Sequence, residues 1–150
     1  MEHIWSVLCR LSIVDQKRNN VSLIEVMEQL SFVGETEVES EHTPALTFPV
    51  ELVTLWSRSD LKTPEASRAR VLMLSPEGEF LNPEGVEYEV DLTEFQRFRA
   101  MGKFEALPYV GDGIYRFVVQ SLDAEREQWR DVASIPLEIV RENSPEENTP

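Results

Sequence analysis

The segment Val86-Glu87-Tyr88-Glu89-Val90-Asp91-Leu92 decides the fold class, because apolar and acidic residues alternate strictly along it. A period of two places one kind of side chain on each face of a β-strand, whereas a helix needs a period near 3.6. The segment is therefore predicted to be a strand whose buried face carries its apolar residues, Val86, Tyr88, Val90 and Leu92.

The segments on both sides of this strand have a similar character. They are rich in β-branched and aromatic residues, and short polar turns such as 15–20 and 75–78 separate them. Further strands are predicted over residues 4–14, 21–32, 47–58, 68–74, 95–104, 114–122 and 129–140. This spacing is typical of an all-β sandwich or barrel. We expect an all-β antiparallel sandwich of about seven to nine strands.

Residues 22–31 keep a helical alternative, because Ser22-x-x-Glu25 resembles a capping box that precedes helically spaced apolar residues. The strand interpretation, which we favour, turns the following residues inward: Ile24, Val26, Leu30 and Phe32. Residues 93–98 hold a weaker signal for a short helix, so the predicted fold includes at most one short helix on a sheet.

Pro49 bears on which strands lie at sheet edges. Proline has no backbone N–H to donate, so it occurs on edge strands or at the first residues of a strand. The candidate edges are the first strand, the strand that contains Pro49, and the last strand.

The run Gly113-Ile114-Tyr115-Arg116-Phe117 resembles the Gly-x-Tyr-x-(Phe or Cys) pattern that opens the penultimate strand of immunoglobulin-like sandwiches. The resemblance implies an immunoglobulin-like fold in which the Tyr115 hydroxyl hydrogen-bonds back to the preceding connection. It also makes Trp56 a candidate for the buried tryptophan of strand C.

Two shorter patterns, 19–24 and Phe48-Pro49, together with the Gly-x-Tyr-x-Phe run, resemble a family of uncharacterised bacterial proteins known as a domain of unknown function. That resemblance would span most of residues 3–140. It implies an immunoglobulin-like sandwich, and it carries no functional residue to this chain.

Composition predicts one domain and limits the partners. A chain of 150 residues is long enough to bury its own core, so residues 1–140 are expected to form a single domain followed by a disordered acidic tail over 141–150. The formal net charge of −14 disfavours nucleic acids and anionic membranes, because both would repel the chain. The lone cysteine, Cys9, and the lack of a signal-like N-terminus predict a cytoplasmic protein.

The sequence holds no recognisable catalytic set. His3 and His42 are the only histidines, and neither lies near a nucleophile motif. Cys9 shares a predicted strand face with Trp5 and Leu11, where a free cysteine usually packs as a small hydrophobic residue. No phosphate-binding glycine loop is present. These observations together lead us to expect no cofactor, no metal and no enzymatic activity.

The most distinctive local feature is a comb of glutamates. If residues 35–41 are extended, their acidic side chains project to one side, where they could meet a basic partner: Glu35, Glu37, Glu39 and Glu41. Calcium is a weaker alternative, because calcium loops usually contain Asp, Asn and Gly. Arg68, Arg70, Arg97 and Arg99 are expected to form cross-strand ion pairs with acidic residues such as Glu87 and Glu89.

These observations lead to a functional expectation. Exposed strand edges without a catalytic set predict a non-catalytic cytoplasmic module that binds a protein partner or self-associates. The alternative is a small-molecule-binding domain, or an unrecognised carboxylate enzyme, that uses loops such as 107–113.

Overall fold

The computed structural model describes residues 1–33 and 45–143, and within these ranges it contains strands and no helix. Both helical alternatives are therefore wrong. Eleven strands are present, more than expected, because residues 21–33 form two strands and two further strands have only two residues each. In chain order they are β1 (Glu2–Val14), β2 (Val21–Val26), β3 (Gln29–Val33), β4 (Ala45–Leu46), β5 (Val50–Ser57), β6 (Glu65–Leu74), β7 (Val86–Leu92), β8 (Arg97–Phe104), β9 (Leu107–Pro108), β10 (Gly113–Asp123) and β11 (Gln128–Glu142).

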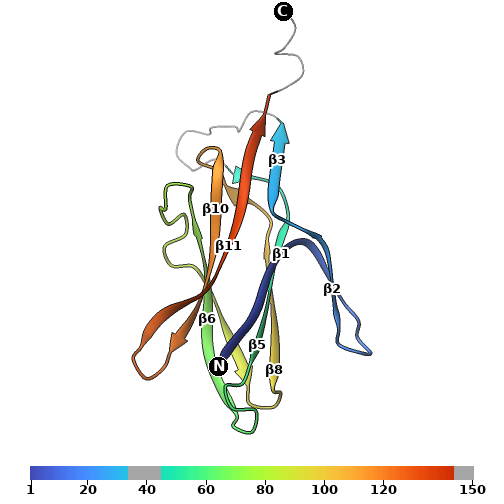
Figure 1. Cartoon of the computed structure of the whole chain (residues 1–150), viewed down its shortest axis with the longest axis vertical. Coiled ribbons are helices and arrows are strands. Elements are labelled where there is room, and N and C mark those ends of the chain that lie inside the picture. Colours follow the sequence, from blue (N-terminus) through green and yellow to red (C-terminus); the bar gives the residue numbers. More distant parts are fainter. Residues whose placement is uncertain (34–44, 144–150) are drawn as a thin grey trace, which may run out of the picture.

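Two large sheets enclose the core, and the third sheet is the small β4-β9 pair (Figure 1). The first large sheet has the order β2-β1-β5-β8, and the second has the order β3-β11-β10-β6-β7. All pairs are antiparallel except β3 with β11, which is parallel. The expectation of a purely antiparallel arrangement is thus wrong at this one pair.

Strand β7 confirms the alternation that sets the fold class. Val90 and Leu92 are fully buried, and the acidic residues between the apolar positions are exposed. Val86 departs from the pattern with 52% exposure, because it lies at the first position of the strand, at an opening between the sheets.

The single strand expected over residues 21–32 is two strands that belong to different sheets. Glu25 adopts a positive φ of 55°, and the Met27 N–H donates to the Leu8 carbonyl over 2.8 Å, where the chain leaves the first sheet. Leu30 is buried in the second sheet as expected. Ile24 and Val26 are 44% and 57% exposed, so their inward assignment is wrong.

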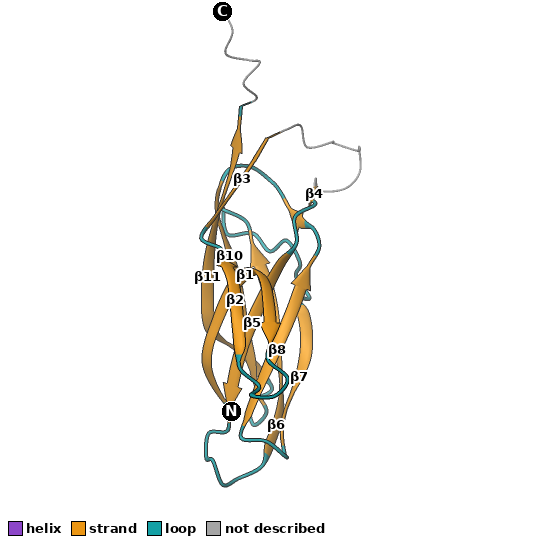
Figure 2. Ribbon diagram, turned by 90° about the vertical axis from the view of Figure 1, so that its right-hand side faces the viewer, coloured by secondary structure: helices purple, strands orange, loops and turns teal. Residues whose placement is uncertain are grey.

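The four-stranded sheet curls into a half-barrel, because the long hairpin of β1 and β2 folds back over β5 and β8 (Figure 2). Arg99 of β8 donates to the carbonyl of Asn19 in the hairpin turn over 2.8 Å. The Ser12 hydroxyl donates to Oε2 of Glu51 on β5 over 2.6 Å. Cys9 is fully buried at the base of this hairpin and packs as the small hydrophobic residue that the sequence predicted.

The two aromatic residues singled out by the resemblance lie in different sheets. The Tyr115 hydroxyl accepts from the Val110 N–H and donates to the Gly111 carbonyl, both over 2.8 Å, as the resemblance implies. Trp56 is fully buried on β5, but β5 does not pair with β10, the strand of Tyr115. Strand C of an immunoglobulin domain shares a sheet with that tyrosine's strand, so the strand-C assignment of Trp56 is wrong.

The edge strands agree only in part with those expected. Strand β5 is flanked by β1 and β8, so its expected edge position is wrong. The first and last strands are edges over part of their length, as expected, because β2 pairs with β1 only from Cys9 to Val14 and β3 pairs with β11 only from Glu138 to Glu142. Pro49 instead directly precedes β5, where the ladder needs no N–H from it. The edges of the two large sheets are β2, β8, β3 and β7.

The end of the domain lies slightly beyond the expected boundary at residue 140. Strand β11 continues to Glu142, where it pairs with Val33 of β3. The tail beyond residue 143 falls outside the described residues.

Candidate functional site

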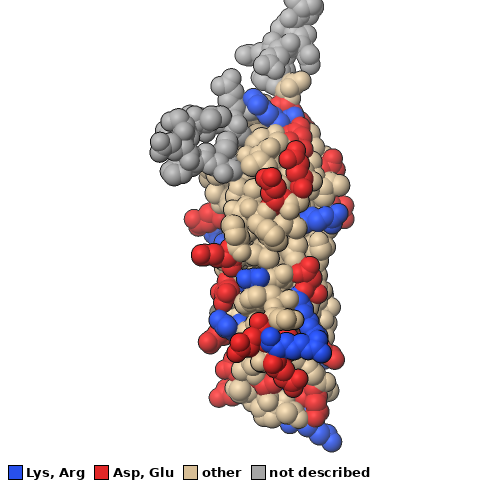
Figure 3. All heavy atoms as spheres, turned by 90° about the vertical axis from the view of Figure 1, so that its left-hand side faces the viewer, with Lys and Arg blue, Asp and Glu red and all other residues tan. Residues whose placement is uncertain are grey.

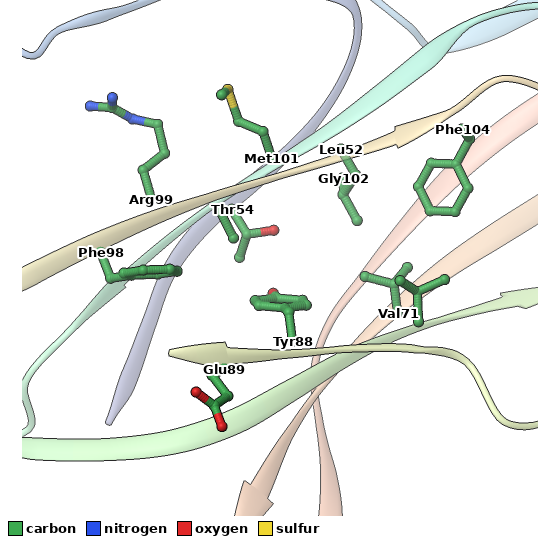
Figure 4. Close-up of a pocket in the computed structure, with 12 residues that line it drawn as sticks. Leu52, Thr54, Val71, Tyr88, Glu89, Phe98, Arg99, Met101, Gly102 and Phe104 are labelled. Carbon is green, nitrogen blue, oxygen red and sulfur yellow. The ribbon is translucent and has the colours of Figure 1, made fainter. Parts of the chain in front are cut away.

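A cavity opens between edge strands β7 and β8, where the two large sheets diverge (Figure 4). It exists because the core-facing positions of β8 carry two small residues, Ala100 and Gly102, between Phe98 and Phe104. A Cβ atom built on Gly102 would have no closer neighbours than the Phe104 ring at 3.8 Å and the Leu52 carbonyl oxygen at 4.0 Å. The small side chains of Ala100 and Gly102 therefore leave space between β8 and the core at this point.

The remaining walls of the cavity come from three other strands. Leu52 and Thr54 of β5 and Val71 of β6 form its inner end, and Val86 and Tyr88 of β7 face β8 across it. Its volume is about 330 Å³. Pockets that hold small ligands run from about 300 to 1,000 Å³, so this cavity is at the small end of that range.

The polar groups inside the cavity belong to a chain of hydrogen bonds that crosses the core. His3 Nε2 lies 2.7 Å from Ser6 Oγ, and the Ser6 hydroxyl donates to Thr54 Oγ1 over 3.1 Å. Thr54 in turn hydrogen-bonds the Tyr88 hydroxyl, which also accepts from Trp56 Nε1 over 3.2 Å. The chain therefore ends at two hydroxyls in the cavity wall.

Burial dominates the electrostatics of both ends of this chain. It lowers the pKa of the His3 imidazole below its usual 6.5, which favours the neutral ring. It also raises the pKa of Tyr88 above 10, although hydrogen bonds from Trp56 and Thr54 act in the opposite direction. Both groups are thus uncharged near neutral pH, and Tyr88 presents a hydroxyl rather than a phenolate.

The two charged residues that line the cavity, Glu89 and Arg99, do not point into it. Figure 4 shows their side chains directed away from the cavity on opposite sides, beyond β7 and β8. Arg99 is held on the outer side of β8 by its bond to Asn19. The interior therefore presents aliphatic and aromatic groups and two neutral hydroxyls.

A second feature is the outer face of the β1–β2 hairpin. Leu11 pairs directly with Ile24, and Ile13 lies two residues further along the same face. These three residues, which we call the hairpin patch, are 45%, 44% and 51% exposed, respectively. The opposite face of the hairpin is half-buried, and its Ser12 contacts Glu51 and the Met101 sulfur. The hairpin thus exposes its aliphatic patch to solvent and turns its other face, which contains Ser12, toward the rest of the sheet.

Figure 3 shows acidic and basic side chains side by side on one face of the molecule, without a large basic patch. Arg68 pairs with Glu87 at 3.2 Å, which confirms the expected cross-strand ion pair. Among residues 1–33 and 45–143, none of Arg70, Arg97 and Arg99 forms an ion pair, contrary to expectation. Arg70 stacks over the Trp129 ring at 4.3 Å and donates to Gln120, and Arg99 donates to Asn19.

The sequence-derived candidates are not brought together at the cavity. The glutamate comb, Glu35 to Glu41, and His42 lie outside the described residues. Residues 107–113, the loop proposed for a small-molecule site, supply a buried Leu107 and the turn bonded to Tyr115, away from the cavity. Within residues 1–33 and 45–143, no three His, Cys, Asp or Glu residues cluster as metal ligands, and no helix is long and apolar enough to cross a membrane.

The cavity residues were missed, although one signal for them exists in the sequence. Phe98-x-Ala100-x-Gly102-x-Phe104 places two small residues between two aromatic residues on one face of a predicted strand. Such a pattern marks a gap in a core layer. The partner strand that makes the gap a cavity, β7, cannot be identified without the topology.

Comparisons with known proteins identify no relative that bears on function. No family model matches the chain, so the resemblance to the uncharacterised bacterial family stays a prediction, and no curated protein matches it. Among solved structures, the chain is similar in shape to part of a family 123 glycoside hydrolase from Clostridium perfringens, which was studied for glycolipid glycan hydrolysis. The TM-score is 0.38 at 10% identity, covering 94% of this chain and 28% of that chain. This chain thus spans little more than a quarter of that protein.

Proposed function

We propose that this chain is a non-catalytic cytoplasmic module that binds a protein partner through the hairpin patch. The observation that carries the proposal is the exposure of Leu11, Ile13 and Ile24 on one face of a projecting hairpin. Burying aliphatic side chains of this size on association contributes roughly 25 cal/mol for each Å² removed from water. Contiguous exposed aliphatic residues are characteristic of protein interaction sites.

The charge of the chain determines the kind of partner. With a net charge of −14, the chain repels acidic proteins at long range and attracts basic ones. The hairpin patch itself supplies apolar contacts, and the nearest charged pair, Arg10 and Glu25 at 3.5 Å, is exposed beside it. The partner is therefore a protein with a positive overall charge and an apolar contact surface.

The finer fold assignment belongs to the same proposal. We infer an immunoglobulin-like arrangement, supported by the two hydrogen bonds of Tyr115 and by the two large sheets that enclose the core. Small modules of this architecture present edges and hairpins to partners, which agrees with a binding role.

The environment of Ser6, the best candidate nucleophile, supports the proposal that the chain is non-catalytic. Ser6 lies within 2.7 Å of His3, but its hydroxyl donates to Thr54 inside the core. A serine nucleophile needs its proton directed at a base and its oxygen exposed to substrate. Cys9 is fully buried, and burial raises the pKa of its thiol, which disfavours the reactive thiolate.

The test is capture of a partner by the tagged full-length chain from its source lysate, compared between matched variants. Leu11→Ser with Ile24→Ser removes the hairpin patch. Leu61→Ser with Ile114→Ser removes one leucine and one isoleucine of similar exposure, 52% and 50%, that lie elsewhere on the surface. We expect a stoichiometric basic protein that survives high salt, is lost in the first variant and is retained in the second.

Two results would contradict this proposal. A partner retained equally by both variants would place the interface elsewhere. No protein at all, with a monomeric mass for the chain at micromolar concentration, would exclude both a partner and self-association.

A further inference from the structure

The β7–β8 cavity shares no lining residue with the hairpin patch and bears on a different ligand class. Its floor and walls are apolar side chains of the core, and its opening lies between two sheet edges that do not pair with each other. The cavity has a volume of about 330 Å³, and a Cβ atom on Gly102 would meet its nearest neighbours only at ordinary contact distance. Space for an additional small molecule is therefore present in the folded chain.

The hydrogen bonds at the cavity wall indicate which polar group a bound ligand would meet. Ser6 donates to Thr54, Trp56 donates to the Tyr88 oxygen, and the Thr54 and Tyr88 hydroxyls hydrogen-bond with each other. Each of these two hydroxyls has a single proton, and the hydrogen bond between them uses only one of the two protons. Among the described residues, no other acceptor is recorded for the proton of either hydroxyl. One hydroxyl proton of the pair is thus left at the wall of the cavity, and it is the Tyr88 proton when Thr54 is the donor of the shared bond.

We propose that this cavity binds a small neutral molecule with an aromatic or aliphatic body and one hydrogen-bond acceptor, such as a carbonyl oxygen, which accepts from the Tyr88 hydroxyl. The aromatic rings of Phe98 and Phe104 enclose the apolar body. An apolar pocket with few convergent polar groups is the usual form of a small-molecule site.

Charged ligands fit this cavity poorly. The charged side chains among its lining, Glu89 and Arg99, point away from it, so a bound ion would lose its hydration without a charged partner. The net charge of −14 adds long-range repulsion for an anion. A neutral ligand avoids both costs.

The test uses three probes and the full-length ¹⁵N-labelled chain. Acetophenone has a phenyl ring and a carbonyl acceptor, isopropylbenzene has nearly the same shape without the acceptor, and benzoate carries a negative charge. We expect acetophenone to shift the backbone amides of Tyr88, Ala100 and Gly102 saturably. Isopropylbenzene should bind about three- to tenfold more weakly, since it lacks one hydrogen bond, and benzoate should not saturate.

Variants separate binding in the cavity from binding elsewhere. Gly102→Leu places a side chain in the cavity and should abolish the acetophenone shifts, whereas Lys103→Leu adds the same side chain at the neighbouring exposed position and should preserve them. Ala100→Val provides a second, smaller obstruction, and thermal melting verifies that each variant is folded. Tyr88→Phe should reduce acetophenone affinity to that of isopropylbenzene while leaving isopropylbenzene binding unchanged.

Three results would overturn the inference. These are the absence of saturable shifts with acetophenone, shifts that persist in the folded obstructed variants, and equal acetophenone affinity in Tyr88→Phe and the unaltered chain. None of them affects the hairpin patch, because the capture experiment uses other residues and another readout.

Discussion

His3 couples the stability of the fold to pH, because it begins the hydrogen-bond chain that ends at the cavity. Burial lowers the pKa of its imidazole, so the unfolded chain takes up this proton at a higher pH than the folded chain does. The stability that depends on a neutral His3 is therefore present above pH 6.5 and is lost as pH falls below that value. We expect His3→Gln to lose less unfolding free energy than the unaltered chain between about pH 7.5 and pH 5.5 in denaturant titrations.

The comparison between the two proteins isolates His3, because both contain the same carboxylates and the acid titration of those groups cancels in the difference. The variant His42→Gln changes the other histidine and serves as the control. If His3→Gln and the unaltered chain lose equal free energy on acidification, the imidazole does not titrate at a lowered pKa.

At the scale of single elements, the turn between β10 and β11 contains a strained residue. Glu127 has a positive φ of 53°, a conformation that costs a residue with a side chain about 1 kcal/mol and costs glycine nothing. Glu127→Gly should therefore raise the unfolding free energy by several tenths of a kcal/mol, measured by chemical denaturation.

Glu125→Gly in the same turn is the matched control, because Glu125 is not among the residues with a positive φ. There the added freedom of the unfolded chain should lower stability by about 0.5 kcal/mol. Equal effects of the two substitutions would mean that Glu127 carries no strain in solution.

Element identity is also where sequence reasoning succeeded and failed most clearly. The alternation in 86–92 predicts β7 correctly, since a strand with one buried face must show a period of two. Residues 21–32 also form strands as favoured, but the transfer of the chain between sheets at Met27 has no local signal. Its cause is the docking of β3 beside β11, which lies more than 100 residues away.

Over the whole molecule, unbalanced negative charge opposes folding. The 28 acidic residues outnumber the 14 basic ones, and the ion pairs in the described ranges are mostly exposed at the surface. Sodium chloride screens repulsion between exposed charges, so we expect it to raise the melting temperature by a few degrees at neutral pH.

Near the isoelectric point, at pH about 4.5, the same salt increment should have little effect, because the net repulsion is then absent. A melting temperature that does not change with salt at neutral pH would mean that local pairing already compensates the charge.

The candidate site was harder to predict than the fold for a reason that applies to the whole molecule. Fold class follows from local alternation, which the sequence contains. The cavity requires β7 and β8 to meet as free edges of two different sheets, and edge positions depend on which strands pair. The incorrect edge assigned to β5, and the edge positions of β7 and β8 that were not expected, show that strand composition alone does not determine this.

Strand β8 has different neighbours on its two faces. Its outer face carries Met101 and Arg99 against the hairpin, and its inner face carries Phe98 and Gly102 at the cavity. A displacement of this strand would change the contacts at both the hairpin and the cavity. Thermodynamic linkage then requires reciprocity: whatever factor an occupant of the cavity applies to the affinity at the hairpin, a partner on the hairpin applies to the affinity of the cavity.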